Sequence, residues 1–183
     1  PQLMREIGRL REITFRRANE GTGKELDLDK YDDAYEQLFI WNREQNEIVG
    51  AYRIGRLNEL GLKGMYTSNF YNFSPEFYDK YQQGLEMGRS FVSPDYQRKP
   101  YSLLLLWRGI GAYMMRNPQY RYLIGAVSVS SDYSAVSRAL IAELLLNDNQ
   151  SVSSKQKAKL HKFNREIRRY CKMLNISNPE QLS

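Results

Sequence analysis

The sequence has very few of the side chains on which most metal and nucleophilic chemistry depends. Among 183 residues there is one cysteine, Cys171, and one histidine, His161. A single cysteine excludes an internal disulfide framework, and usual zinc sites need several His or Cys ligands, so no metal is expected. A Ser-His-Asp or Cys-His mechanism would have to use His161, which lies in a region rich in lysine and arginine. Any chemistry is therefore expected to use carboxylates, backbone amides or an external cofactor.

The sequence also lacks a long hydrophobic run. Its longest apolar stretch, residues 103–107, is far shorter than the roughly 20 residues of a membrane-spanning helix. No signal peptide opens the chain, which predicts a cytoplasmic protein. Hydrophobic residues at 42% and charged residues at 26% are typical of one globular domain. The first residue is not Met, so we expect a mature product or a fragment of a longer chain.

The net charge of +6 is confined to the C-terminal region. Positive and negative charges balance in residues 1–150, whereas residues 151–183 carry the whole excess. The basic residues of this region are Lys155, Lys157, Lys159, Lys162, Arg165, Arg168, Arg169 and Lys172. We therefore expect a domain over residues 1–150 and a basic tail over residues 151–183.

The tail has apolar residues at three- and four-residue steps, including Leu160, Phe163, Ile167 and Leu174. This spacing predicts an amphipathic helix, which can dock on its own domain with its cations in solvent. Basic amphipathic helices also bind anionic surfaces, so contact with a membrane or an anionic carrier is the second interpretation. Nucleic acid is a weaker one, because the tail has no interleaved aromatic platform for stacking bases.

Residues 1–146 alternate between helical and strand patterns. The strand–helix–strand unit over residues 85–130 is expected to be a right-handed parallel crossover. The predicted helices are 2–17, a short one beginning at Pro75, 101–115 with Trp107 and Met114 in the core, and 134–146 with Ser134 as N-cap. The predicted strands are 37–41 and 47–54, joined as a hairpin, then 85–92 and a buried strand over 122–130. The fold class is therefore mixed α/β or α+β.

Four sequence strings in order resemble the GNAT acyltransferase superfamily, in particular its hemolysin-like branch of ornithine and glycine N-acyltransferases, to which the acyl-homoserine-lactone synthases are related. The resemblance covers roughly residues 10–146. The strings are Leu10-Arg11 with Phe15, Asp29-Lys30-Tyr31-Asp32, Ile48-Val49-Gly50-Ala51-Tyr52-Arg53, and Glu86-Met87-Gly88-Arg89-Ser90-Phe91-Val92 leading into Pro94-Asp95-Tyr96.

The resemblance implies a mixed sheet with a central parallel strand pair flanked by helices. It also implies transfer of an acyl group, expected to be long, from an acyl-carrier-protein or CoA thioester to the amine of an amino acid, in aminolipid synthesis. The family's Gly-rich pyrophosphate loop is replaced here by residues 97–102, which contain no glycine. This departure favours a phosphopantetheine arm on a carrier protein. The family's first strand and last two strands have no counterpart in the pattern, so we expect truncation at one or both ends.

By the same resemblance, Glu86 and Arg89 are the expected catalytic residues, with Glu86 as general base. Three residues separate them, so they face opposite ways in a regular strand, and a bulge near Gly88 is expected to bring them together. The expected acceptor-binding residues are Asp29, Asp32, Arg53, Arg11 and Phe15.

The expected thioester or pantetheine contacts are the backbone amides of Phe91 and Val92, together with Arg98, Lys99 and Ser102. Tyr66 and Phe70 are expected to contact the acyl chain, because they lie in a segment dense in aromatic residues.

Two other functions remain open. An acyl-homoserine-lactone type of signal synthase is one, although the Trp that normally follows the first-helix Phe is missing from residues 18–20. A non-catalytic module that binds a membrane surface is the other.

Overall fold

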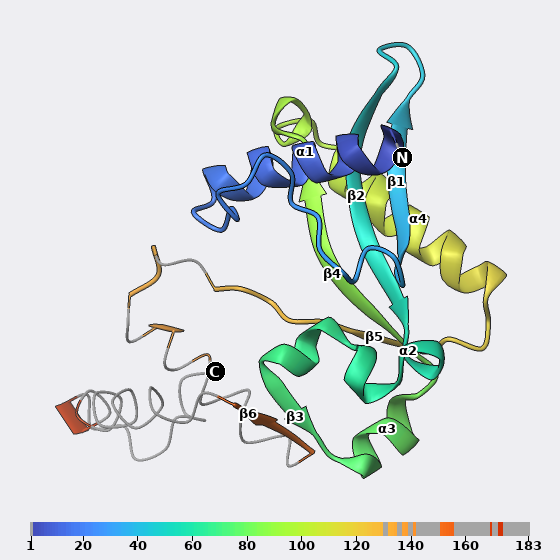
Figure 1. The fold of residues 1–183 in the computed structure, drawn as a ribbon. Helices are drawn as coiled ribbons and strands as arrows, with labels where there is room; N and C mark the ends of the chain where they lie inside the picture. The colour runs from blue at the N-terminus through green and yellow to red at the C-terminus, as the bar shows by residue number, and fades with distance from the viewer. Residues whose placement is uncertain are drawn as a thin grey trace. The chain divides into compact units, whose positions relative to one another are not determined.

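The computed structural model describes residues 2–129, 132–134, 137–138, 141, 151–155, 169 and 172–173. The chain divides into two compact units (Figure 1). Unit 1 comprises Pro1–Tyr66 and Lys80–Ala126, and unit 2 comprises Thr67–Asp79 and Val127–Ser183. All but one of the residues predicted to form the site lie in unit 1.

Unit 1 is built on a mixed four-stranded sheet in the order β1-β2-β4-β5. Its strands are β1 (Glu36–Asn42), β2 (Glu47–Arg56), β4 (Gly84–Val92) and β5 (Tyr122–Ile124). Pairing is antiparallel for β1–β2 and β2–β4 and parallel for β4–β5. The predicted α+β class and parallel pair are confirmed.

The β1–β2 hairpin forms where the sequence predicted it. Asn42 ends β1, and its side-chain oxygen accepts hydrogen bonds from the backbone N–H groups of Glu44 and Gln45. Asn46 has a φ of 56°, a left-handed conformation that asparagine tolerates better than most residues.

Helices lie against opposite faces of this sheet (Figure 1). On one face, α1 (Gln2–Arg17) packs Ile7 and Leu10 on Ile48, Ala51 and Phe91. On the other, α4 (Ser102–Arg116) buries a stripe at every fourth residue. That stripe consists of Ser102, Leu106 and Ile110.

Strand β4 has two irregularities, one in its pairing with β2 and one in its pairing with β5. Pairing with β2 passes from Ala51–Phe91 to Arg53–Gly88, so β4 has one extra residue between these pairs. The extra residue makes a β-bulge that includes Arg89, whose φ is 48°. The bulge expected near Gly88 is confirmed. Pairing with β5 covers three residues only and ends at Glu86–Ile124, while β4 continues to Val92.

Shorter elements complete the chain. Gly61 has a φ of 59° and kinks α2. In unit 2, β3 pairs with β6 in antiparallel fashion, and the Ser74 hydroxyl accepts a hydrogen bond from the Phe77 N–H at the start of α3, as its predicted helix start requires. The bounds are α2 Leu57–Gly64, η1 Tyr66–Asn69, β3 Tyr71–Phe73, α3 Pro75–Tyr81, η2 Pro94–Tyr96 and β6 Val152–Ser154.

Several sequence expectations are corrected. The buried strand over 122–130 is wrong beyond Ile124, and β5 is an edge strand with Leu123 40% exposed, because no further described strand pairs with it. Trp107 is outside the core because it follows the buried Leu106 by one residue, about 100° around the helix. Met114 does pack against the core.

The C-terminal predictions are tested only in small part. Residues 152–154 form β6, so a wholly helical tail is wrong there. The Ser134 hydroxyl accepts a hydrogen bond from the Ser137 N–H at 3.0 Å, as predicted for an N-cap. Most of residues 139–150 and 156–183 lie outside the described residues.

Candidate active site

The Glu86 carboxylate lies on the α1 face of the sheet, at the last paired position of β4 and β5. Its side chain is almost wholly buried, with the residue 2% exposed. The Tyr35 hydroxyl donates a hydrogen bond to Glu86 Oε2, and the Tyr66 backbone N–H donates another at 3.0 Å. One carboxylate oxygen is therefore held by two donors from different elements.

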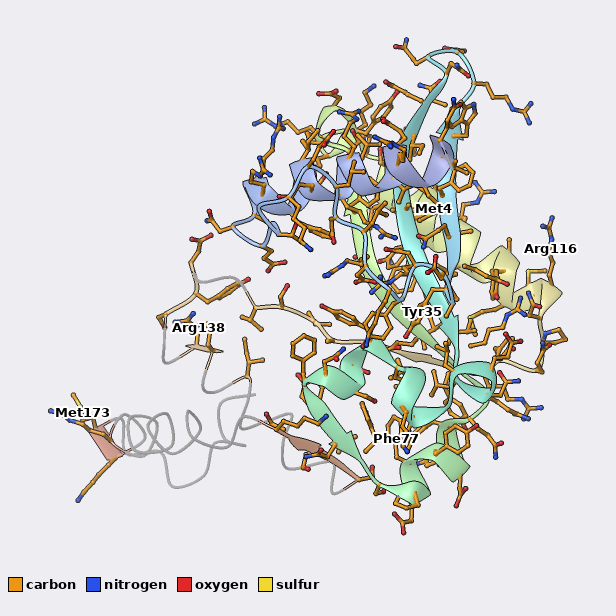
Figure 2. All side chains as sticks on the ribbon, viewed as in Figure 1. Met4, Tyr35, Phe77, Arg116, Arg138 and Met173 are labelled. Atoms are coloured by element: carbon orange, nitrogen blue, oxygen red, sulfur yellow. The ribbon has the colours of Figure 1, made fainter. Side chains whose placement is uncertain are left out.

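Tyr35 was missed by the sequence analysis. Tyr35, labelled in Figure 2, directly precedes β1. Its ring reaches Glu86 because Gly55 on β2 has no side chain: a Cβ there would lie 2.4 Å from the ring. Burial first, and then the hydrogen bond to Glu86, raises the pKa of Tyr35 well above its usual value. The phenol therefore stays protonated and remains a donor to the carboxylate.

Arg11, Arg53, Asp29 and Asp32, all predicted to bind the acceptor, form one ion-pair network, in which both arginines are buried and Asp29 is half-buried. Arg11 donates to Asp32 at 2.8 Å, and Arg53 lies 2.7 Å from Asp29 and 3.4 Å from Asp32. Arg11 also donates to the side-chain oxygen of Gln37 at 2.6 Å. These contacts span 21 to 26 positions in the sequence. The two aspartates are thus already paired with arginine in the protein.

Burial determines the direction of the pKa shift for Arg11 but not for Asp32. It would raise the pKa of Asp32, but the Asp29 backbone N–H and the Arg11 guanidinium outweigh it, and the net pKa is lowered. Burial lowers the pKa of Arg11, against its pairing with Asp32. Asp32 is consequently ionised at neutral pH, and both partners remain charged.

Arg53 is enclosed by aromatic rings as well as acids. Its guanidinium lies 5.1 Å from the ring centres of Tyr35 and Tyr66 and 5.7 Å from that of Tyr31. Nη1 bonds to Asp29, while Nε and Nη2 are buried without a hydrogen-bond partner. Two adjacent donors on one edge of a guanidinium match the geometry of a carboxylate.

The bulge turns Arg89 toward the same cluster. Its guanidinium lies 5.0 Å from the Tyr66 ring centre and 5.9 Å from that of Phe15. Its Nη2 lies 3.7 Å from Asp29, and its Nε lies 3.4 Å from Asp27 Oδ2. The last contact is an ion pair only, since neither atom makes a hydrogen bond.

Asp27 is a second residue that the sequence analysis missed. Its side chain is buried, and burial raises its pKa although Arg89 and Arg11 lower it in part. An acid two residues before Asp29 gives no sign of burial in the sequence, because acidic residues in such a segment are usually solvated.

Glu12 anchors the loop that follows α1. It is 2% exposed and accepts hydrogen bonds from the Thr22 hydroxyl at 2.6 Å, the Thr22 and Gly23 N–H groups, and Arg16. Beside it is a surface hollow of about 500 Å³ that Arg16 and Lys24 also line. The residues lining this hollow do not include the cluster around Glu86.

We expect Glu12→Gln to change the pH dependence of stability. Hydrogen bonds from Thr22 above all lower the pKa of Glu12 from 4.5 to about 2. A depressed folded-state pKa stabilises the protein above pH 4.5, and that stabilisation is lost as the pH falls toward 2. The free energy of unfolding, measured by urea titration, should therefore fall more steeply over this range in the wild type than in Glu12→Gln. Parallel curves would contradict the anchoring role.

The residues predicted to contact the thioester lie around the start of α4. Phe91 is buried in the core on the α1 face, and the Val92 carbonyl accepts a hydrogen bond from Gln97 at 3.1 Å. The Ser102 hydroxyl donates to the Tyr96 carbonyl. Arg98 and Lys99 are exposed, with the Lys99 ammonium 4.0 Å from the Tyr96 ring centre. Their role toward the donor stays a prediction.

The two residues predicted to contact the acyl chain have different environments. The Tyr66 ring packs edge-on against Tyr31 and lies under two guanidinium groups, so it belongs to the polar cluster. Phe70 lies in unit 2 and is 43% exposed. Among the described residues, no group of three or more His, Cys, Asp or Glu side chains is arranged to hold a metal ion.

The α+β fold with its parallel β4–β5 pair is consistent with the GNAT fold. Residues 10–108 match the family model of the acetyltransferase (GNAT) domain, and the chain belongs to that family. It is 39% identical over 170 residues to the glycine N(alpha)-acyltransferase of Bacteroides thetaiotaomicron, a match that covers 83% of this chain and 50% of that protein.

Two further relatives have related names. The glycine N(alpha)-acyltransferase of Phocaeicola vulgatus is 39% identical over 160 residues, covering 79% of this chain and 49% of that protein. The L-ornithine N(alpha)-acyltransferase of Brucella abortus is 32% identical over 102 residues, covering 51% and 36%. The chain thus spans about half the length of the glycine acyltransferases it matches. No solved structure matches the chain significantly. The resemblance drawn from the four sequence strings is confirmed.

Proposed function

We propose that this chain carries the acyl-transfer site of an N-acyltransferase that moves a long acyl group from a thioester to the α-amine of an amino acid. Glycine is the favoured acceptor, because the relatives named for glycine are more similar and are matched over more of this chain than the one named for ornithine. The donor is an acyl chain on the phosphopantetheine of a carrier protein, or on CoA.

The observation that carries the proposal is the position of Glu86. It lies where the β4–β5 pairing ends. The Tyr66 N–H donates a hydrogen bond to it, and the Tyr66 ring contacts the guanidinium groups of Arg53 and Arg89. In the reaction the amine nitrogen attacks the thioester carbonyl, a C–N bond forms and the C–S bond breaks. Glu86 takes the ammonium proton, directly or through a water molecule, and the leaving thiolate is later protonated.

Arg53 is the proposed site of the acceptor carboxylate. Its Nε and Nη2 are adjacent buried donors without hydrogen-bond partners, and a carboxylate that binds them would satisfy both. Asp29, Asp32, Arg11 and Phe15 would support this site, and Arg89 would face the reacting groups from the bulge. The backbone amides at Phe91 and Val92, with Arg98, Lys99 and Ser102, remain the proposed contacts of the donor.

The proposal assigns transfer to residues 1–150 and treats residues 151–183 as a basic extension that contacts an anionic carrier or membrane. No helix of the described residues is long and apolar enough to cross a membrane.

The test is an acylation assay read by mass spectrometry. The 183-residue chain is incubated with palmitoyl carrier protein or palmitoyl-CoA and a panel that includes glycine, ornithine and S-adenosylmethionine. We expect N-acylglycine as the main product. Lactone formed from S-adenosylmethionine would overturn the assignment in favour of a signal synthase, and no acylated product in any mixture would contradict transfer by this chain.

Tyr35→Phe should lower the turnover of this reaction about tenfold while the protein stays folded. The substitution removes one of the two donors that fix Glu86 Oε2, and a hydrogen bond to a charged group contributes about 1.5–3 kcal/mol. Single-turnover rates and thermal denaturation measure the two effects.

The matched control is Tyr120→Phe. Tyr120 is also buried, and its hydroxyl donates to Asn58 at 3.1 Å, away from the cluster. Because its partner is a neutral amide, Tyr120→Phe should lose about 0.5–1.5 kcal/mol of stability and no turnover. Equal turnover in the two variants would show that Tyr35 has only a structural role.

A further inference from the structure

The α4 helix has a second apolar stripe that its packing on the sheet does not use. Ser102, Leu106 and Ile110 form the buried stripe, whereas Leu104, Trp107, Gly111 and Met115 follow one another at three- and four-residue steps on the opposite side. Leu104 and Trp107 are each 53% exposed, and Met115 is 84% exposed. Leu103 and Leu105 flank the stripe and are exposed as well. We call Leu103, Leu104, Leu105, Trp107 and Met115 the outer face of α4.

Charge around the outer face has one sign. Residues 97–116 contain four basic and no acidic side chains. Arg108 and Arg116 lie on the helix itself, where Arg116 points outward from its C-terminal end (Figure 2), and Arg98 and Lys99 precede it; all four are exposed. The rest of residues 1–150 carries 15 basic and 19 acidic side chains, so this basic and apolar combination is local.

Such a surface fits the interfacial region of an anionic membrane. Leucine side chains insert at the boundary of the acyl chains, tryptophan prefers the headgroup level, and arginines beside them attract anionic lipid. Without a partner, these large apolar side chains would remain in contact with water. Proteins that do not bind a partner or a membrane rarely expose so many of them together on one helix.

We propose that the outer face of α4 docks the protein on the surface of an anionic lipid bilayer. Docking uses a folded helix of unit 1 and does not require residues 151–183. The outer face lies on the opposite side of the sheet from Glu86 and Arg53, so substitutions on it leave the acyl-transfer cluster intact. Arg98 and Lys99 are also proposed contacts of the donor, so on this side of the sheet the test varies only Leu104 and Arg108, which the proposed function does not use.

The test uses the two tryptophans of the chain. In a Trp41→Phe background, Trp107 is the only tryptophan, so tryptophan fluorescence reports on the outer face of α4 alone. Vesicles of equal parts phosphatidylglycerol and phosphatidylcholine should shift its emission to the blue and co-sediment with the protein. Pure phosphatidylcholine vesicles or raised salt should weaken both effects, because the attraction is partly electrostatic.

Leu104→Glu should reduce partitioning into the mixed vesicles by about tenfold or more, since it places a charge in the apolar contact. Leu3→Glu, at an exposed leucine of α1, is the matched control and should bind like the wild type. Arg108→Glu should also reduce binding, and it keeps the test valid if Leu104→Glu does not fold by circular dichroism.

Three results would overturn the proposal. The first is vesicle binding that Leu104→Glu and Arg108→Glu leave unchanged, which would locate binding elsewhere, for example in residues 151–183. The second is a dimer in solution that Leu104→Glu dissociates without any vesicle binding by the wild type. The third is a blue shift caused by an acidic carrier protein and not by vesicles.

Discussion

Glu86→Gln should reduce the rate of acyl transfer by about 10²–10⁴-fold, the usual contribution of a general base, with little change in melting temperature. Glutamine has the same shape, and its carbonyl oxygen can still accept the hydrogen bonds from Tyr35 and the Tyr66 N–H. It cannot accept a proton from the ammonium group. The measurement is a single-turnover assay with palmitoyl carrier protein and glycine.

Glu47→Gln is the control for Glu86→Gln. Its carboxylate also accepts a hydrogen bond from a tyrosine, Tyr96, at 2.6 Å, but it is exposed and lies outside the cluster. Glu47→Gln should transfer acyl groups at the wild-type rate. A wild-type rate in Glu86→Gln would remove the base assignment while leaving N-acyl transfer by this chain intact.

Arg53→Met should destabilise the protein more than any of the other substitutions. Arg53 is 1% exposed, and its removal leaves Asp29 without its closest cation and takes one of two from Asp32. Breaking a buried ion pair from one side costs about 3–5 kcal/mol of unfolding free energy. Urea denaturation at neutral pH measures the loss.

Arg56→Met, three residues along the same strand, provides the comparison. Arg56 pairs with Glu36 and Glu59 near the surface, and exposed pairs contribute about 0–1 kcal/mol. Equal losses of unfolding free energy in the two variants would contradict the stabilising role of the ion pairs of Arg53.

Arg53→Lys then separates folding from acceptor binding. Lysine keeps the positive charge but lacks the two adjacent N–H donors of the guanidinium. This variant should therefore be more stable than Arg53→Met and should still show a raised KM for glycine. An unchanged KM would place the acceptor carboxylate elsewhere.

Local patterns in the sequence were sufficient for the main helices and strands of unit 1. The apolar spacing of α1, the polar Asn42–Asn46 connection and the run leading to Pro94 each reflect interactions within a few residues. The bulge was expected from the family resemblance, which makes Glu86 and Arg89 partners although they cannot share a face of a regular strand. Of the five acceptor residues that the resemblance grouped together, Arg11, Asp29, Asp32 and Arg53 meet in one network.

The missed features depend on distant partners. Tyr35 reaches Glu86 across 51 positions, through space that Gly55 leaves open, and neither residue has a local signature. Trp107 was assigned to the core on its hydrophobicity, but which side of an apolar helix is buried depends on the sheet beneath it. The length of β5 was overestimated because a run of apolar residues does not show where pairing stops.

The backbone of β4 at the bulge depends on side chains from another part of the chain. Left-handed backbone is unfavourable for L-residues by roughly 1–2 kcal/mol, and Arg89 has no compensating short polar side chain of the kind that asparagine has. Its guanidinium is instead held by Asp27 and Asp29, which precede β1. If the acceptor binds at the proposed site and draws Asp29 away, this hold weakens, and we expect the backbone of β4 at the bulge to change its conformation in response.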